Sequence, residues 1–466
     1  MSAGEGKRAA VVLAAGDGKR LKSKLPKVLH RVAGRPLVGH VLAALAPLDL
    51  DQTVVVVSRT VDELRTSDGS LGLSTDTTYA IQDPPRGTGD AVRVALEGLG
   101  DTTTVLVVPG DAPLLTTETF RSLFELHESS GAAVTLLTSE IDDPTGYGRV
   151  VRGKGSTVER IVEHEDATQD ELLIREINAA VYVFDREALA RMLPKLDDSN
   201  AQGEFYMTDV IGLMREESLG VVAHKTDAVE TSGVNDRAQL SDVGRALRKR
   251  ACTRWMSEGV TVIDPATTYI DPTVVIEPDA TILPLTFLEG STVIRAGAEV
   301  GPQARVIDSE IGADASVTFS VVRGSTIGRS ASVGPYASLR PGTVLAEDAH
   351  LGTFVEAKKT TLGRRSKAPH LSYLGDAEIG DDVNIGAGTI TCNWDGTEKH
   401  RTVIEDDAYI SSDTMLVAPV RVGKGAATGA GSVVRDDVPD GALAVGVPAR
   451  VIPGKGNRKK KKPPPG

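Results

Sequence analysis

The carboxyl-terminal half of the sequence contains YIDPTVVIEPDATILPLTFLEGSTVIRAGAEVGPQARV at residues 269–306. An apolar residue returns every six positions here and in two later runs: Ile270, Ile276, Ile282, Leu288, Ile294, Val300 and Val306; Ile327, Val333, Leu339, Leu345, Leu351 and Ala357; and Ile404, Ile410, Leu416, Val422, Thr428 and Val434. A helix repeats every 3.6 residues and an alternating strand every two, so neither explains a period of six. The hexapeptide parallel β-helix does, with each hexad forming one side of a triangular coil around an apolar axis.

Two places interrupt this six-residue register. From Ala357 to Ile379 is 22 residues and from Thr391 to Ile404 is 13, and neither number is a multiple of six. We expect extra residues to leave the coil as loops at both breaks, and loops on a rigid solenoid commonly carry function. The first break contains His370 in residues 367–373, and the second contains Asn393 and Lys399. The alternative interpretation of each break is an insertion without function.

The amino-terminal half follows a different pattern. Short apolar runs alternate with helical periodicity over the first ~230 residues. The expected strands are Ala9–Leu13, Thr53–Val57, Thr104–Val108, Ala133–Thr138 and Ala179–Phe184, with helices such as Val38–Leu45 and Glu118–His127 between them. This alternation predicts a mainly parallel sheet with helices on both faces. Ligands of such folds bind beyond the carboxyl ends of the strands.

A single amphipathic, basic helix separates the two patterns, with Leu240, Val243 and Leu247 at helical spacing. The expected organisation is a Rossmann-like α/β domain at residues 1–235, a linker helix at 236–258, and a β-helix domain at 259–451. A disordered basic and proline-rich tail is expected at residues 452–466.

Composition narrows the class of protein. The 466 residues are too many for one ordinary core, and the aromatic content of 4% suits a narrow aliphatic stack. The net charge of −12 argues against general nucleic-acid binding. Cys252 and Cys392 are too few for a disulfide framework, and the apolar run Ala9–Ala15 is too short to span a membrane. We therefore expect a cytoplasmic protein with no nucleic-acid or membrane partner.

A glycine-rich turn, LAAGDGKRL at residues 13–21, follows the first expected strand. Such a turn lets backbone N–H groups approach phosphate oxygens closely. It is neither a Walker loop nor a good dinucleotide fingerprint, because no Gly-Lys-Ser/Thr follows and Leu21 stands at the third glycine position. Arg20 and Lys27 can converge on a triphosphate, Arg20 by forked hydrogen bonds and Lys27 as a point charge. A tight turn with two solvated cations is the alternative.

The longer segment LAAGDGKRLKSKLPKVLH (residues 13–30) resembles the signature of sugar-1-phosphate nucleotidyltransferases. Together with the hexapeptide half, it makes nearly the whole chain similar to the bacterial bifunctional N-acetylglucosamine-1-phosphate uridyltransferases and glucosamine-1-phosphate N-acetyltransferases. The resemblance implies a left-handed β-helix and two reactions. Acetyl-CoA acetylates glucosamine 1-phosphate, and UTP then converts the product to UDP-N-acetylglucosamine with release of pyrophosphate. The product would supply peptidoglycan and lipopolysaccharide-type polymers of the cell envelope.

For the uridylyl reaction, the resemblance implies a nucleotide and sugar site and a metal site. Arg20 and Lys27 would be catalytic, and binding is implied for Leu13, Ala14, Ala15, Gly16, Lys27, Gln82, Gly87, Thr88, Gly148, Glu163, Asn178 and Asn235. Asp111 would hold Mg2+ with Asn235, since hard oxygen ligands and substrate phosphates are what Mg2+ prefers. The sugar phosphate would attack the α-phosphorus of UTP in line, which needs positioning and charge neutralisation rather than covalent help.

For the acetyl reaction, an amine that attacks a thioester needs a base, and histidine is the usual candidate near neutral pH. The resemblance assigns this role to His370, with Glu356 as a possible partner that orients the ring. It implies substrate binding by Arg340, Lys358, Tyr373, Asn384 and Lys399, and acetyl-CoA binding by Ala387, Asn393, Ser412, Ala430 and Arg450. Asn393, Ser412 or Tyr373 would stabilise the oxyanion. The acyl site of such β-helices forms between subunits, so a homotrimer is implied.

The sequence departs from the family pattern at a few positions. Pro85 stands where a second glutamine is expected beside the uracil, and Lys19 stands where threonine is usual. Near the carboxyl terminus, Arg450 lies in a segment closer to generic hexapeptide acyltransferases and would supply the charge for the CoA phosphate.

Three hypotheses follow from these patterns. The first is the bifunctional enzyme, favoured by both motif sets in one chain. The second is a nucleotidyltransferase whose β-helix serves only oligomerisation or regulation, in which case His370→Ala would leave every activity unchanged. The third is a non-catalytic assembly or binding protein, which the set Arg20, Lys27 and Asp111 argues against.

Overall fold

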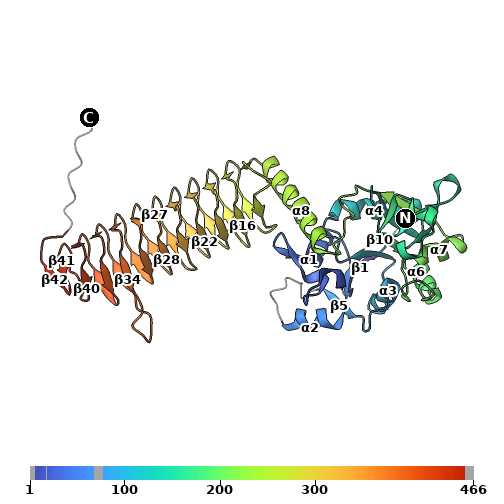
Figure 1. Ribbon diagram of the computed structural model, residues 1–466, viewed down its shortest axis with the longest axis horizontal. Coiled ribbons are helices and arrows are strands. Elements are labelled where there is room, and N and C mark those ends of the chain that lie inside the picture. Colours follow the sequence, from blue (N-terminus) through green and yellow to red (C-terminus); the bar gives the residue numbers. More distant parts are fainter. Residues whose placement is uncertain (1–5, 17, 68–76, 457–466) are drawn as a thin grey trace. The chain divides into compact units, whose positions relative to one another are not determined.

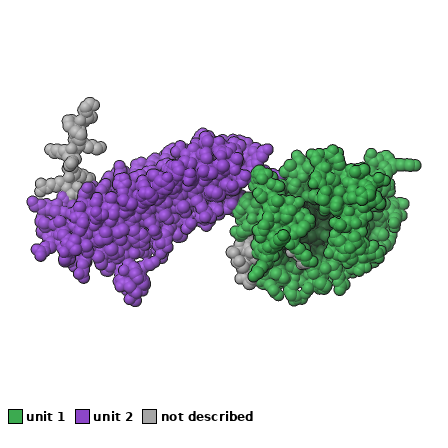
Figure 2. Space-filling model, in the orientation of Figure 1, with its two compact units in different colours: residues 1–247 green, residues 248–466 purple. Residues whose placement is uncertain are grey.

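The computed structural model describes residues 6–16, 18–67 and 77–456. The chain divides into two compact units, residues 1–247 and 248–466, which Figure 2 distinguishes by colour. Unit 1 is a layered α/β structure and unit 2 is a stack of short strands (Figure 1). Most of the predicted tail, residues 457–466, lies outside the described residues.

A nine-stranded sheet forms the centre of unit 1, in the order β11-β7-β10-β6-β1-β4-β5, with the β8–β9 hairpin attached to β10. The predicted mainly parallel sheet is confirmed, with two reversals: β10 is antiparallel to both β6 and β7, and β9 is antiparallel to β8. The strands are β1 (Arg8–Ala14), β4 (Gln52–Val57), β5 (Thr78–Ile81), β6 (Thr104–Pro109), β7 (Val134–Glu140), β8 (Arg149–Arg152), β9 (Val158–Val162), β10 (Glu176–Asp185) and β11 (Val221–Lys225).

Helices cover both faces of this sheet, as the apolar pattern predicts. Successive residues of a strand point to opposite faces, so β1 buries Ala9 and Val11 in one core cluster and Ala10 and Val12 in the other. This is why the strand is apolar throughout rather than alternating. The helices are α1 (Leu37–Leu45), α2 (Arg59–Ser67), α3 (Thr88–Leu96), α4 (Thr117–Ser130), α5 (Gln169–Leu172), α6 (Arg186–Met192) and α7 (Asp209–Glu216).

Helix α8 (Arg237–Ser257) occupies the stretch expected to be the linker. Val243 packs in a small cluster with Leu37, Leu114 and Val234 of unit 1. Cys252 and Trp255, in the last turns of α8, belong to the apolar core of unit 2. Both cysteines of the chain are free thiols.

Unit 2 is a parallel β-helix, which confirms the interpretation of the six-residue period. Its strands run from β12 (Thr261–Val262) to β42 (Ala449–Ile452), and every third strand belongs to the same sheet. We name these the first sheet (β12, β15 and onward to β41 and β42), the second sheet (β13 to β40) and the third sheet (β14 to β38). Every residue of the three predicted hexad series is buried.

The expectation that the first register break is a bulging loop is wrong. Residues 367–370 form β30 and residues 373–375 form β31, and both strands pair with the preceding coil. The 22-residue interval arises because two of its sides are one residue short: Ala357 and Leu362 are five residues apart instead of six, and so are Leu374 and Ile379, although all four are buried. The register therefore shifts through missing residues, and not through extra ones.

The second break is a loop, as predicted. Residues 393–401 leave the coil between β34 (Ile390–Cys392) and β35 (Thr402–Ile404), and Trp394 pairs with Lys399 across the loop. The Asp395 carboxylate accepts from the N–H groups of Thr397 and Glu398 at 2.7 and 2.8 Å and contacts His400 Nε2 at 2.6 Å. The loop is therefore a closed hairpin.

Across residues 6–16, 18–67 and 77–456, no helix combines the length and apolar character required to cross a membrane.

Candidate functional site

A cavity of about 680 Å3 in unit 1 opens beyond the carboxyl ends of β1 and β6. This is where ligands of parallel α/β sheets bind. The glycine turn leaves the end of β1, and Gly110 at the end of β6 donates its N–H to the Leu13 carbonyl oxygen at 2.8 Å. The phosphate-binding turn and the predicted metal motif are thereby held side by side.

Most of the residues predicted for the nucleotide line this cavity: Leu13, Ala15, Gly16, Arg20, Lys27, Gln82, Gly87, Thr88, Asp111 and Asn235. Ala14 does not, because its side chain is buried in the core on the opposite face of β1. Pro85 and Lys19, the two departures from the family pattern, also line the cavity.

The predicted metal ligands converge on one point, which Lys27 Nζ occupies. The ammonium forms an ion pair with the Asp111 carboxylate and donates to Asn235 Oδ1 at 2.9 Å. Gly18 permits this approach, because a Cβ at its φ of 62° would meet Lys27 Cβ at 2.5 Å. A carboxylate oxygen and an amide oxygen that share one cation form a donor set that fits Mg2+.

Elsewhere in the cavity lining, Gln82 is buried against Asp90, which is buried too and lies outside the lining. Gln82 Nε2 donates to the Gly87 carbonyl oxygen at 3.0 Å and to Asp90 Oδ2 at 2.8 Å. Arg93 pairs with the other oxygen of the Asp90 carboxylate. This network fixes the side chain that was expected to read the uracil ring.

Three predicted sugar-binding residues gather beside a second cavity of about 440 Å3, which Glu163 lines. Asn178 donates its backbone N–H to the Gly148 carbonyl oxygen at 2.9 Å, and a Cβ at Gly148 would lie 3.4 Å from the Glu163 carboxylate. Burial raises the pKa of Glu163, although Thr208 donates a hydrogen bond to it at 3.0 Å. Gly148 and Asn178 themselves line neither cavity among the described residues.

Arg149 links Tyr147 to His164 in this sugar region, and it is only 1% exposed. Its guanidinium donates to the Tyr147 carbonyl oxygen and contacts His164 Nδ1 at 3.4 Å. The Tyr147 hydroxyl accepts from the Gly233 N–H, close to Asp111 and Arg20, and its pKa is raised mainly by burial. Sequence reasoning did not single out Tyr147 and Arg149.

In unit 2, the predicted acetyl-site residues gather mainly on the outer face of the second sheet. Arg340 follows β25 (Ser338–Leu339), Lys358 ends β28 (Glu356–Lys358), and Tyr373 begins β31 (Tyr373–Gly375) on adjacent coils. The 393–401 loop brings Lys399 to Lys358: the Lys399 ammonium, and then Arg340, lower the pKa of Lys358 through like-charge repulsion. Three cations thus meet on one face, an arrangement suited to a phosphate group.

A compact polar cluster lies beside these cations. Asn393 is buried and donates to Asp376 Oδ2 at 2.6 Å, with Tyr373 Oη 3.5 Å from its Nδ2. Gly375 leaves room for this pair, because a Cβ there would meet Tyr373 Oη at 2.5 Å and Asn393 Nδ2 at 2.6 Å. Glu356, the possible partner of His370, forms an ion pair with Arg340 at 2.9 Å.

His370 is exposed at the end of β30 (Lys367–His370), where the first sheet turns into the second. Along the same corner, Ala387, Ser412 and Ala430 occupy equivalent positions of successive coils, each two residues after the buried residues Ile385, Ile410 and Thr428. The Asp413 N–H donates to the Ala387 carbonyl oxygen at 2.7 Å, and the Gly431 N–H donates to Ser412 at 2.9 Å. The three predicted acetyl-CoA positions therefore form a column.

Two predicted residues lie apart from the second-sheet face. Asn384 begins β33 (Asn384–Ile385) and pairs with Lys367 on the first sheet. Arg450 is exposed on the terminal strand β42, opposite Val445. Within one chain, Asn384 and the cations of the second sheet occupy different faces of the coil.

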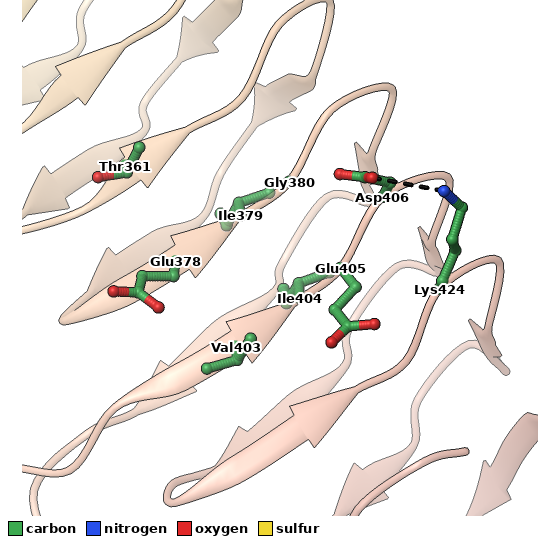
Figure 3. Close-up of a pocket in the computed structure, with 9 residues that line it drawn as sticks. All are labelled: Thr361, Glu378, Ile379, Gly380, Val403, Ile404, Glu405, Asp406 and Lys424. Carbon is green, nitrogen blue, oxygen red and sulfur yellow. Dashed lines mark ion pairs between the residues drawn. The ribbon is translucent and has the colours of Figure 1, made fainter. Parts of the chain in front are cut away.

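A further groove of about 370 Å3 lies on the third sheet, over β29 (Thr361–Leu362), β32 (Ala377–Ile379) and β35. Figure 3 shows its charged side chains around an aliphatic floor that includes Val403. These charges are already paired, Asp406 with Lys424 at 3.5 Å and Glu405 with Arg421 at 2.8 Å. None of the predicted acetyl-site residues lines this groove.

Some cavity-lining residues carried no sequence signal that reasoning could use. Gln202 and Glu204 reach the nucleotide cavity from a loop far from the glycine turn. The Gly89 N–H donates to the Phe205 carbonyl oxygen at 2.8 Å, and this contact brings the loop to the start of α3. A tertiary contact of this kind leaves no local pattern in the sequence.

The fold defines a class of protein: an α/β unit with a phosphate-binding glycine turn, joined to a hexapeptide β-helix. Residues 10–198 match the family of the MobA-like NTP transferase domain. The chain is 50% identical over 441 residues to the bifunctional protein GlmU of Heliobacterium modesticaldum, covering 94% of this chain and 95% of that protein. It is 48% identical to those of Exiguobacterium sibiricum, over 94% of this chain and 96% of the relative, and Streptomyces coelicolor, over 94% and 91%.

The chain therefore belongs to the family of the bifunctional protein GlmU. Its activities are acetyl transfer to glucosamine 1-phosphate and uridylyl transfer to N-acetylglucosamine 1-phosphate, which together make UDP-N-acetylglucosamine. Of the three hypotheses from the sequence, this supports the bifunctional enzyme.

Proposed function

We propose that the two activities occupy separate sites, one in the large cavity of unit 1 and one on the second-sheet face of unit 2. The first assignment rests on the contacts of Lys27, whose ammonium pairs with the Asp111 carboxylate and donates to Asn235 Oδ1 beside the glycine turn. The corresponding observation in unit 2 is the meeting of Arg340, Lys358 and Lys399 beside Tyr373 and Asn393. On this view the two domains extend over residues 1–235 and 259–451, with α8 between them.

In the first site, the glycine turn and Gln82 hold UTP, while Gly148, Glu163 and Asn178 hold the sugar. The phosphate oxygen of N-acetylglucosamine 1-phosphate attacks the α-phosphorus of UTP, a new phosphorus–oxygen bond forms, and pyrophosphate leaves. Arg20 and Lys27 neutralise the charge that develops on the phosphates. Mg2+, held by Asp111 and Asn235, would add charge neutralisation and orient the phosphate oxygens.

In the second site, the three cations bind the phosphate of glucosamine 1-phosphate. His370 takes a proton from the amine as it attacks the carbonyl carbon of acetyl-CoA, and the thiol of CoA leaves. Tyr373 or Asn393 stabilises the oxyanion. The column of Ala387, Ser412 and Ala430 leads from His370 towards the carboxyl-terminal coils, where Arg450 would meet the CoA phosphate.

We propose a homotrimer, and an apolar ladder on the β-helix supports it. At the corner that carries His370, successive coils place Phe319, Tyr336, Phe354 and Leu371 in line, and the last three are 56%, 59% and 60% exposed. Phe319 and Phe354 lie 5.7 and 5.6 Å from the Tyr336 ring. An exposed apolar patch of this kind marks an interface.

The placement of Asn384 supports the same assembly. Asn384 faces outward from the first sheet, so a second copy of the chain could bring it to the cations of the second sheet. Phe354→Ser should lower the mass measured by light scattering, and acetyl transfer should fall with it. If the Phe354→Ser variant still had the mass of a trimer, the ladder would not be part of the subunit interface.

UTP and acetyl-CoA are cytoplasmic metabolites and both cysteines are free. These two points support the proposed cytoplasmic location.

Two single variants test the separate sites. Asp111→Ala should abolish pyrophosphate release from UTP while acetyl-CoA consumption with glucosamine 1-phosphate continues, and His370→Ala should do the reverse. Loss of both activities in either folded variant would contradict the assignment, as would the survival of both.

A further inference from the structure

Gln82 lines the nucleotide cavity and is 3% exposed, and Asp90, which lies behind it and outside the cavity lining, is 6% exposed. Both hydrogens of the Gln82 carboxamide are used: Nε2 donates to the Gly87 carbonyl oxygen at 3.0 Å and to Asp90 Oδ2 at 2.8 Å. The carbonyl oxygen Oε1 is therefore the atom that Gln82 can offer to a ligand in the cavity.

The chemistry of the partners fixes this orientation of the amide. A backbone carbonyl oxygen and an ionised carboxylate only accept hydrogen bonds, so both must face the NH2 group of Gln82. Arg93 in turn donates to the second oxygen of Asp90 and keeps the carboxylate in place. If the amide were turned over, Gln82 Oε1 would face two other acceptors, the Gly87 carbonyl oxygen and Asp90 Oδ2.

Donors lie next to the Gln82 acceptor. Gly87 is the cap of α3 and Thr88 is its first residue, and both line the cavity with Gln82. The first N–H groups of a helix have no acceptor within the helix. This part of the cavity thus presents the acceptor Gln82 Oε1 beside the N–H donors of Gly87 and Thr88.

This polarity matches one kind of pyrimidine edge. Uracil and thymine present a ring N–H beside a carbonyl oxygen, whereas cytosine presents a ring nitrogen acceptor beside an amino group. Cytosine would place acceptor against acceptor and donor against donor, and a site built to hydrogen-bond one pattern rejects the other strongly.

We infer that Asp90 is a positioning residue that sets base specificity: by holding the Gln82 amide, it makes the site accept nucleotides with an imide edge and reject cytidine nucleotides. The inference rests on the proposed nucleotide site and deepens it. It also follows that the Gln82 contact does not separate uracil from thymine, because their imide edges are identical.

The test compares kcat/KM for UTP, dTTP and CTP in the full-length protein with Mg2+ and N-acetylglucosamine 1-phosphate. Wild type should prefer UTP over CTP by more than about 100-fold. In Asp90→Asn one oxygen must serve both Gln82 and Arg93, so one donor loses its acceptor. The UTP preference over CTP should fall at least about 10-fold, whereas the ratio of UTP to dTTP should stay within about twofold.

Two further variants keep the test decisive. Arg93→Gln changes a side chain that is half exposed and should shift the UTP/CTP ratio in the same direction by a smaller factor. The matched control is Asp185→Asn, another aspartate at a helix start in unit 1, whose Oδ1 accepts from the Ala188 N–H at 2.7 Å far from the cavity lining. It should leave the UTP/CTP ratio unchanged.

An unchanged UTP/CTP ratio in folded Asp90→Asn overturns the inference, and so does an equal loss of activity with both nucleotides. The Asp111→Asn variant distinguishes a failure of the Asp90 role from a failure of the proposed nucleotide site. If Asp111→Asn retains uridylyl transfer, the cavity is not the active site; if it is inactive while Asp90→Asn keeps its selectivity, only the role of Asp90 is refuted.

Discussion

Gly375→Ala should reduce acetyl transfer and leave uridylyl transfer unchanged, because it displaces the contact between Tyr373 and Asn393. The added Cβ would meet Tyr373 Oη at 2.5 Å and Asn393 Nδ2 at 2.6 Å, whereas ordinary contact begins at 3.4 Å. One or both groups must therefore move by about 1 Å, and a misplacement of that size costs about 100-fold in rate, or about 2.7 kcal/mol of transition-state stabilisation. The φ angle of Gly375 is not in the left-handed range, so the backbone itself should tolerate alanine.

The assay follows CoA release with glucosamine 1-phosphate, and pyrophosphate release from UTP provides an internal control in the same preparation. We expect kcat for acetyl transfer to fall about 100-fold and uridylyl transfer to stay within about twofold. Thermal unfolding should show that unit 2 remains folded. Full acetyl transfer in a folded Gly375→Ala protein would refute the placement of Tyr373 and Asn393 at the reacting groups, provided that His370→Ala is inactive in the same assay.

Three other perturbations are informative. Arg149→Leu removes the buried guanidinium that holds the Tyr147 carbonyl and His164, so KM for N-acetylglucosamine 1-phosphate should rise about 10-fold while KM for UTP changes little; equal changes in both constants would indicate a general loss of structure. The hydrogen bond to Asp395 raises the pKa of His400, so the stabilisation of the 393–401 loop is complete below the ordinary histidine pKa of about 6.5 and is lost as the pH rises through the raised value. Amide exchange at Thr397 and Glu398, corrected for intrinsic rate, should therefore accelerate as the pH rises above about 6.5 in wild type and not in His400→Phe. Lys358→Met should weaken binding of glucosamine 1-phosphate and, by removing one of three like charges, should leave the fold intact; an unchanged KM would exclude Lys358 from the phosphate site.

The fold could be predicted largely from periodicity. The six-residue repeat of aliphatic residues determines which side chains fill the axis, and the residues of the three hexad series, from Ile270 to Val434, are buried as the repeat requires. Strand–helix alternation likewise predicted the sheet of unit 1. It did not predict that β10 runs against its neighbours, because apolar content reports burial on both faces and carries no information about strand direction.

The first register break shows where spacing alone misleads. A 22-residue interval can result from added residues or from sides that are one residue short, and counting does not distinguish them. Lys359 and Asp376 stand at the corners of the two short sides, and their left-handed backbone is shared by corners of full-length sides such as Asp279 and Leu285, so no residue type marks the shorter ones. His370 consequently stands on a strand end and not on a loop.

The site was predictable where a motif carries its own chemistry and not where tertiary contact creates it. Lys27, Asp111 and Asn235 come from three distant motifs and meet as expected. Asp90, Arg149 and Gly375 act on other side chains and were not singled out, because buried hydrogen bonds between elements and space for a neighbouring side chain leave no mark in composition or spacing.

Strand pairing joins each described coil of unit 2 to the coils directly before and after it, as the pairing of Ile282 with Val300 illustrates. The β-helix can thus be treated as a series of interchangeable segments. Deleting one whole coil from the region before Ser338 would bring the acetyl site nearer to α8 by about 4.8 Å while preserving every contact around it. Loss of a single residue instead shortens one side, as between Ala357 and Leu362, and leaves the number of coils unchanged. The distance from the first coil to the acetyl site is therefore free to change only in steps of one full turn.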